Sequence, residues 1–240
     1  MGVSLDELGI GLINVGSVGF ENIACIFDET RLQRNCAIIT DYDATIEGAS
    51  KSKPKAEALG KFRSEKLDKL FDSNSYVETF YAPHTLEVDF ANLKNNRGFI
   101  NEVIKTTYKD QPTIDKHIAL IDSDDEVARY DSVMTVVNNV KKGWYATLLA
   151  AVVDYTAIIP DYIIKSLAFA SHEIIDEQII WKIVKYSFSG YDSNDTKDLK
   201  KQLKSANTEE KKNAFVVAFR NAFPKDMATM FLDEVDKYDQ

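Results

Sequence analysis

Two aspartates, Asp41 and Asp43, directly follow the apolar run Cys36–Thr40. A continuous apolar run of this length predicts a strand that is covered on both faces, as in a parallel sheet. Residues two apart at a strand end point to the same side, and open α/β sheets bind ligands at the carboxyl ends of their strands. Two converging carboxylates repel each other unless a cation lies between them, and such oxygen ligands favour Mg²⁺ or Mn²⁺. The alternative is an ordinary polar turn, where aspartate is common.

A second acidic group follows the next predicted strand, Tyr76–Tyr81. Thr85, Glu87 and Asp89 stand at the start of a predicted helix. If this helix begins at the same sheet edge as Asp41, its two acids complete an acidic cluster. The alternative is local: Thr85 can cap the helix, and acids in a first turn interact favourably with the helix dipole.

Lys142 lies beside Gly143 within an apolar helix predicted over 124–155. A glycine inside a helix costs roughly 1 kcal/mol against alanine, so it predicts a close approach to another element. A lysine anchored there could reach a phosphate or a developing negative charge. The alternative is a solvated lysine on the helix surface.

A parallel sheet is needed to bring these residues together. Apolar or β-branched runs predict strands at 9–16, 36–40 and 76–81, and helical spacing predicts helices at 20–31 and 55–71. This alternation indicates βαβ units. Beyond Thr85 we expect helices only, separated by a linker at 187–194; the expected helices are 85–108, 115–122, 124–155, 160–171, 172–188, 195–205, 208–221 and 224–237.

The net charge of −9 and the pI near 4.9 argue against a general electrostatic attraction to nucleic acid. Lysines nevertheless cluster in one segment, where Lys51, Lys53 and Lys55 could form a DNA-binding arm; a solvated helix face is the alternative.

No apolar window is long enough to cross a membrane, and the N-terminus lacks the features of a secretory signal. With two cysteines in all, we expect a reduced, cytoplasmic protein.

Other common chemistries have little support. The three histidines are dispersed, without the spacing of metal ligands. The segment 15–20 resembles a phosphate-binding loop only loosely, because it lacks both the ending of a P-loop and the glycines of a dinucleotide fingerprint.

Taken in order, these segments resemble the Toprim nuclease region of the overcoming-lysogenization-defect (OLD) family, whose full-length members are ATP-dependent endonucleases. The resemblance covers about residues 8–170, and five short motifs carry it: 8–16 with 19–20, 37–43, 85–89, 142–146 and 159–163. It implies a partial Toprim domain, a Rossmann-like α/β fold with a parallel sheet, followed by and interleaved with a mostly helical region. The implied division is a Toprim core, a helical insert, helices returning to the core and a C-terminal extension, at 1–92, 93–132, 133–171 and 172–240.

The resemblance also implies roles for individual residues. Asp41 and Asp43 correspond to the Asp-x-Asp metal ligands, and Glu87 and Asp89 to the second acidic motif of a two-metal Mg²⁺ or Mn²⁺ site. Lys142 corresponds to the lysine that stabilises charge at the scissile phosphate, with Lys141 as the alternative register. The supporting positions of the matched motifs are Thr40, Thr85 and Gly16.

Two parts of the family pattern are missing. The Toprim glutamate, with the strand and helix that carry it, would precede residue 1, and the ATPase half is absent. We therefore expect a fragment, or a short relative that obtains these parts from a partner chain, with weak or no cleavage by this chain alone.

The leading interpretation is the nuclease portion of an OLD-like, DNA-cleaving enzyme, which the family associates with defence against phage. Its expected partners are DNA and an ATPase domain, with ATP bound only by the latter, and a homodimer is compatible. The alternative is a non-catalytic Toprim-like interaction or dimerisation module. Topoisomerase or primase chemistry is disfavoured, because neither a nucleophilic tyrosine nor a primase zinc motif stands out.

Overall fold

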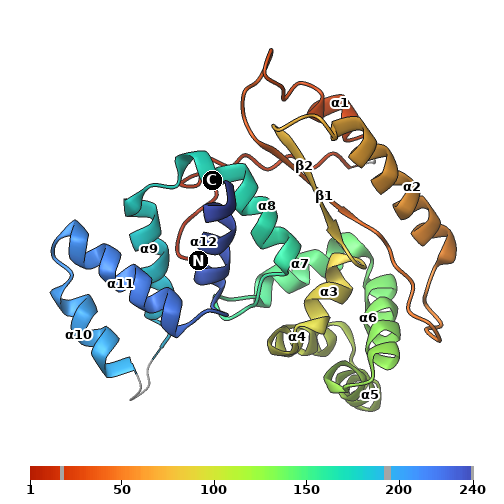
Figure 1. The fold of residues 1–240 in the computed structure, drawn as a ribbon. Helices are drawn as coiled ribbons and strands as arrows, with labels where there is room; N and C mark the ends of the chain where they lie inside the picture. The colour runs from red at the N-terminus through yellow and green to blue at the C-terminus, as the bar shows by residue number, and fades with distance from the viewer. Residues whose placement is uncertain (17–18, 192–195, 239–240) are drawn as a thin grey trace. The chain divides into compact units, whose positions relative to one another are not determined.

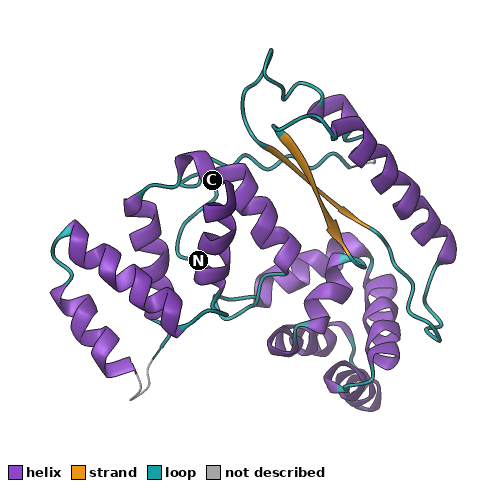
Figure 2. Cartoon of the chain, viewed as in Figure 1, coloured by secondary structure: helices purple, strands orange, loops and turns teal. Residues whose placement is uncertain are grey.

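The computed structural model describes residues 1–16, 19–191 and 196–238. The chain is mostly helical, with one small parallel sheet (Figures 1 and 2). It divides into two compact units. The first unit comprises Met1–Ile38, Ser73–Glu78 and Ile163–Gln240, and the second unit comprises Ile39–Asp72 and Thr79–Tyr162.

The sheet of the described chain consists of β1 (Cys36–Asp41) and β2 (Val77–Ala82). Backbone hydrogen bonds continue the pairing past both strand ends, from Cys36 N to Tyr76 O and from Tyr42 N to Ala82 O, each 2.8 Å long. The prediction that β1 is covered on both faces is wrong. Its side chains alternate instead: Ile38 and Thr40 are buried, whereas Ile39 is 40% exposed.

The predicted strand at 9–16 is also wrong. Leu12 and Ile13 are 81% and 61% exposed, and the segment is irregular. Gly9 and Gly16 have φ angles of 62° and 64°, a left-handed conformation that interrupts an extended run. The following predicted helix is reduced to α1 (Glu21–Ala24). Two residues of the loose phosphate-loop pattern, 17 and 18, lie outside the described residues.

The second unit also contains α-helices and one short 3-10 helix. They are α2 (Pro54–Phe71), α3 (Leu86–Asn92), η1 (Lys94–Asn96), α4 (Arg97–Thr107), α5 (Gln111–Asp122), α6 (Glu126–Val140) and α7 (Lys142–Val152). In Figure 1, α3 follows β2, and α3 packs on α6 while α4 packs on α5 and α7. The carboxylates of Asp110 and Asp125 cap α5 and α6 by accepting hydrogen bonds from Thr113 N and Ala128 N.

Two predicted long helices are broken in this unit. The helix expected over 85–108 is interrupted at Leu93, whose backbone is extended. The helix expected over 124–155 is interrupted at Lys141, which has a φ of 75° and separates α6 from α7. Helical periodicity continues across both breaks, so the apolar pattern alone does not reveal them.

The first unit contains α1 and most of α8 (Asp161–Ser171), together with the C-terminal helices. These are η2 (His172–Ile174), α9 (Glu177–Phe188), α10 (Lys197–Ser205), α11 (Glu209–Ala222) and α12 (Met227–Tyr238). The rings of Phe188, Phe215 and Phe219 pack edge to face between α9 and α11. The predicted linker is described as far as Tyr191, and its remaining residues, 192–194, lie outside the described chain. None of the described helices combines the length and apolar character needed to cross a membrane.

Helix α2 makes a close approach to the end of β1 at Gly60. The buried face of α2 consists of Gly60, Ser64, Leu67 and Phe71, which recur at helical spacing. A Cβ atom at position 60 would collide with the backbone carbonyl group of Tyr42. Glycine at this position therefore sets the distance between α2 and the segment that carries the two aspartates.

We expect Gly60→Ala to destabilise the chain by about 1–3 kcal/mol. The added methyl group would overlap the backbone of Tyr42, and backbone atoms are harder to displace than the end of a flexible side chain. Gly98→Ala is the matched control, since Gly98 is also helical but meets nothing within 4 Å. There the gain in helix propensity gives an unchanged or slightly higher stability. Urea unfolding of both variants measures the difference, and equal midpoints would contradict the close approach at Gly60.

Candidate active site

Asp41 and Asp43 are held at the end of β1 by a residue of α2. The Arg63 guanidinium donates a hydrogen bond to the backbone carbonyl of Asp41 and lies 3.8 Å from the carboxylate of Asp43. Asp43 has a φ of 54°, so strand alternation does not set its direction, contrary to the sequence argument. The sequence analysis did not single out Arg63, so its positioning role was missed.

The loop after β2 is bonded to the loop after β1. The ring Nδ1 of His84 lies 2.8 Å from the carbonyl oxygen of Ala44, and Ala44 N donates to Pro83 O at 3.0 Å. His84 N also donates to the Asp89 carboxylate at 3.3 Å. This pairing brings the start of α3, with Glu87 and Asp89, to the sheet edge that carries Asp41.

Burial and neighbouring charges raise the pKa values of two of these carboxylates, Asp41 and Asp89. Burial, followed by the charges of Asp43 and Glu87, raises the pKa of Asp41, while Lys142 and Arg63 oppose the rise. The pKa of Asp89 is raised to about 6, chiefly by burial. The charges of Asp41 and Glu87 add to this rise, and His84 opposes it. Residues from both predicted acidic motifs therefore lie in one electrostatic environment.

Lys142 faces this acidic cluster. Its ammonium lies 3.7 Å from the Glu87 carboxylate, and the two side chains are 58% and 14% exposed. Lys141 ends α6 in a left-handed conformation, which leaves Lys142 to begin α7. The role predicted for Gly143 is wrong, because a Cβ atom there would meet nothing within 4 Å.

Three hydroxyl groups beside the cluster are buried without a hydrogen-bond partner among the described residues: those of Thr85, Tyr145 and Tyr162. Thr85 occupies the N-cap position of α3, but its hydroxyl bonds to none of the described helix N–H groups. Burial raises the pKa values of both tyrosines; the charge of Glu87 adds to this for Tyr145, and those of Asp89, Asp41 and Glu87 for Tyr162. Sequence reasoning missed both tyrosines, although each stands in a motif quoted for the family resemblance.

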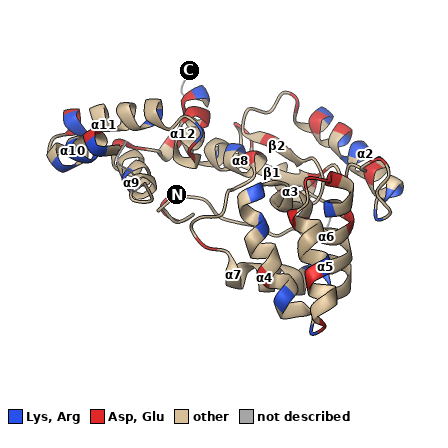
Figure 3. Ribbon diagram, turned by 90° about the horizontal axis from the view of Figure 1, so that it is seen from below, with Lys and Arg blue, Asp and Glu red and all other residues tan. Residues whose placement is uncertain are grey.

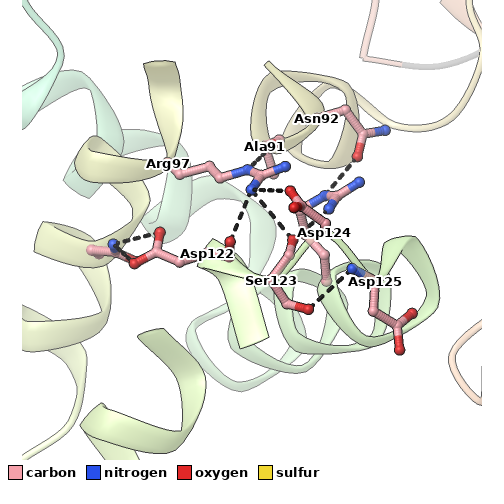
Figure 4. Close-up of polar contacts among 9 residues, drawn as sticks. Ala91, Asn92, Arg97, Asp122, Ser123, Asp124 and Asp125 are labelled. Atoms are coloured by element: carbon pink, nitrogen blue, oxygen red, sulfur yellow. Dashed lines mark hydrogen bonds and ion pairs between the residues drawn. The ribbon is translucent and has the colours of Figure 1, made fainter. Parts of the chain in front are cut away.

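A buried arginine pair fixes the far end of α3 (Figure 4). Arg97 donates to the carbonyl oxygens of Ala91, Asp122 and Ser123. Arg129 donates to the side chain of Asn92 at 3.0 Å and to Ser123 O at 2.8 Å. The last turn of α3 is thereby attached to the loop between α5 and α6.

The segment before Tyr162 is clamped by one buried amide. The Asn96 side chain donates to Ile158 O at 2.8 Å and accepts from Ile158 N at 2.7 Å. Both backbone groups of Ile158 are satisfied by this one residue, which is fully buried. The clamp fixes the backbone from which Tyr162 extends.

No contact with this cluster is seen among the described residues for the other predicted site residues of the second unit. Lys51, Lys53 and Lys55 are exposed in the segment that begins α2, where Lys and Arg alternate with acidic residues (Figure 3). Thr40 is buried in β1, and Gly16 belongs to the first unit, in an exposed turn. Within the described ranges, no three His, Cys, Asp or Glu side chains are grouped closely enough to hold a metal ion by themselves.

Comparisons with protein-family models, with curated proteins and with solved structures gave no significant match to this chain. The resemblance to the OLD family therefore depends on the sequence motifs alone. Any function proposed for this site must therefore be argued from the geometry and charges of its own residues.

We expect Asp89→Asn to stabilise the metal-free chain at neutral pH. The folded-state pKa of Asp89, about 6, lies above its ordinary value of 3.8, so the folded chain keeps a proton that the unfolded chain releases. The carboxyl group therefore reduces stability progressively between about pH 4 and pH 6, by up to about 3 kcal/mol above that range.

Thermal unfolding in a chelator measures this effect. The melting temperatures of Asp89→Asn and the parent should coincide near pH 4 and separate above pH 6, with the variant higher. Asp115→Asn, on the exposed surface of α5, should follow the parent at every pH. If the difference in melting temperature between Asp89→Asn and the parent did not change with pH, the pKa of Asp89 would not be raised in the folded chain.

Proposed function

We propose that this chain carries a divalent-cation-dependent phosphodiesterase site that cleaves DNA, as the nuclease module of an OLD-like ATP-dependent endonuclease. The observation that supports it best is the pairing of Lys142 with an acidic cluster drawn from two strand ends. Hydrolysis of a phosphodiester is helped by divalent cations, which carboxylates can bind, and by a positively charged side chain that can reach the phosphate. The acidic cluster and the exposed Lys142 ammonium could supply these two groups.

The residues of the cluster fit a hard cation. Its donors are carboxylate and hydroxyl oxygens, which Mg²⁺ and Mn²⁺ prefer. Asp41 and Asp89 both have raised pKa values, chiefly because they are buried and further because of neighbouring carboxylates, so a nearby positive charge would favour their ionised forms. The unpartnered hydroxyl of Thr85 adds a further oxygen at the start of α3. Asp41, Asp43, Glu87 and Asp89 are the residues from which the ligands would come, with bound water completing the shell, because no three of them are grouped closely enough to hold an ion by themselves.

The side chains around this cluster have separate tasks in the proposed reaction. When bound, the cation would supply positive charge at the phosphate and lower the pKa of a bound water. Lys142 places a second positive charge, largely in solvent, where a phosphate can reach it. Arg63 is largely buried and bonded to the backbone of Asp41, so it positions the aspartates.

Substitutions in the cluster test this function through Mn²⁺-dependent cleavage of plasmid DNA. Asp41→Asn should abolish both cleavage and Mn²⁺ binding, because it removes a cation ligand. Lys142→Ala should slow single-turnover cleavage by ~100-fold with little change in DNA affinity, the scale of losing one charge-stabilising group. The cleavage rates are measured in a longer protein that contains this chain, because we expect weak or no cleavage by this chain alone; Mn²⁺ binding is measured on the chain itself.

Lys141→Ala is the matched control, since it removes the neighbouring charge outside the cluster. It should cleave at close to the parental rate. If Lys141→Ala were impaired and Lys142→Ala were not, the lysine would be wrongly assigned. If Asp41→Asn bound Mn²⁺ as the parent does, the proposed site would be wrong.

For an acidic protein, DNA binding has to come from local cations. Lys51, Lys53 and Lys55 are exposed together, and the loop that carries them is anchored where Lys51 N donates to the Asp131 carboxylate at 2.8 Å. We propose that this segment contacts the phosphate backbone, apart from the reacting phosphate.

Replacing all three arm lysines with alanine should weaken DNA binding and reduce the slope of log K against log salt by up to about 3, about one for each lost phosphate contact. The single-turnover cleavage rate at saturating DNA should stay unchanged. The control removes three lysines from the basic helix α10 of the first unit (Figure 3), Lys197, Lys201 and Lys204, so the net charge changes equally. Equal slopes for the two triple variants would contradict an arm at α2.

One observation favours the second candidate, a non-catalytic dimerisation module. Leu59, Phe62 and Leu70 form an exposed apolar stripe on α2, at 65%, 66% and 50% exposure. A chain that binds no Mn²⁺ but forms a dimer in sedimentation, lost in Phe62→Glu, would support this candidate instead.

A further inference from the structure

Tyr42, the residue between the two aspartates of the first acidic motif, has an aromatic ring that is only partly enclosed. One face of this ring stacks on the ring of Tyr81 in β2, with centroids 4.6 Å apart and an interplanar angle of 28°. Even so, 36% of Tyr42 remains exposed. An aromatic ring that is supported on one side and open to solvent elsewhere is the kind of surface on which a nucleobase stacks.

Contacts fix this ring in place before any ligand arrives. The Tyr81 hydroxyl donates to the Asp68 carboxylate of α2 at 2.6 Å, which holds the supporting ring of the stack. Tyr42 N donates to Ala82 O at 2.8 Å, and α2 approaches the Tyr42 carbonyl group closely at Gly60. Because the backbone and the supporting ring are already ordered, little conformational entropy is lost when a planar ligand binds.

Tyr42 and Asp41 point to opposite faces of the sheet. Side chains alternate along a strand, and the pairing of β1 with β2 continues through Tyr42. The face of Tyr42 is the one next to α2, since its stacking partner Tyr81 bonds to Asp68 of that helix. Asp41, and with it the acidic cluster, is therefore reached from the other side of the strand end.

The lysine arm lies on the same side of the strand end as Tyr42. Lys53 and Lys55 stand at the N-terminal end of α2. Gly60, where α2 meets the backbone of Tyr42, follows Lys55 by five residues, about 7.5 Å along the helix axis. A DNA strand that contacts the arm and places a phosphate in the acidic cluster therefore passes the strand end beside Tyr42.

A ring in this position binds a base only if that base is not stacked inside a duplex. In double-stranded DNA each base is covered by its neighbours, whereas a single strand or an unpaired nucleotide presents a free face. Stacking accepts every base, because each has a π face, so the ring selects unpaired DNA without selecting a sequence. The arm lysines, by contrast, contact phosphates, which carry no sequence information.

We propose that Tyr42 is a stacking platform for an unpaired base next to the scissile phosphate, so that the site acts on single-stranded or locally unpaired DNA. This inference rests on the proposed function and specifies its substrate. Tyr42 contacts the substrate, while Tyr81 and Gly60 are positioning residues that act through Tyr42.

The test measures binding of labelled oligonucleotides to the full 240-residue chain by fluorescence anisotropy at low salt. The three ligands are an oligothymidine strand, an abasic strand with the same phosphates but no bases, and a hairpin duplex. We expect the parent to bind oligothymidine about tenfold more tightly than the abasic strand, the scale of one stacked base.

Substitutions assign this preference to the ring. Tyr42→Leu should remove it, because leucine fills space without a π face, and Tyr42→Phe should retain it. Tyr155→Leu is the matched control, since Tyr155 is 73% exposed in the same unit, and it should behave as the parent does. The affinity for the hairpin duplex should be the same in all four proteins, because its bases are covered. Melting temperatures verify that each variant is folded.

Each contrary result has a distinct meaning. Equal affinity of the parent for oligothymidine and the abasic strand overturns the platform, and this result does not depend on how any variant folds. An unchanged preference in folded Tyr42→Leu also overturns it, and the stack on Tyr81 is then structural only. The proposed function survives both results if Asp41→Asn abolishes Mn²⁺-dependent cleavage in the longer protein. If the parent binds neither oligothymidine nor the duplex, the platform and the proposed action on DNA fail together.

Discussion

The enclosure of carboxylates at the strand ends is the constraint on which the second unit depends. Burial raises the pKa values of Asp41 and Asp89, and neighbouring acidic charges add to both rises. The fold holds them together by bonding one strand-end loop to the other through His84 and Ala44. Buried carboxylates with raised pKa values lower the stability of the fold. Such groups are found more often at functional sites, because folding alone gives no reason to keep them.

A second layer of contacts prevents the cluster from relaxing. Arg63 and Gly60 fix α2 against the end of β1, the former by hydrogen bonding and the latter by its missing side chain. Arg97 and Arg129 attach the last turn of α3 to the loop between α5 and α6. Arg97 and Arg129 are buried and Arg63 is half-buried. The hydrogen bonds of these arginines go largely to backbone carbonyls, so the arginines act on the geometry of the cluster.

The sequence predicted the two paired strands, most helices and the convergence of two acidic motifs, because periodicity and strand-end polarity are local properties. It failed where tertiary context decides. The segment 9–16 has the composition of a strand but lies exposed between left-handed glycines, and the break at Lys141 leaves the apolar period intact. Arg63 could not be selected in advance, because its importance lies in its long-range partners.

Exposure across the cluster sets the direction from which different ligands can arrive. Asp89 is 9% exposed, and the side chains of Glu87, Asp43 and Lys142 are 14%, 28% and 58% exposed. The Lys142 ammonium is therefore the most exposed of these charges, while the Arg63 guanidinium, at 16% side-chain exposure, is enclosed with the carboxylates. Under the proposed function, a polyanion would meet the Lys142 ammonium before the more enclosed carboxylates, which matters because the net charge of −9 otherwise disfavours its approach. The proposed cation would then be the ligand of the inner carboxylates, so the difference in exposure would keep the two ligands at different depths.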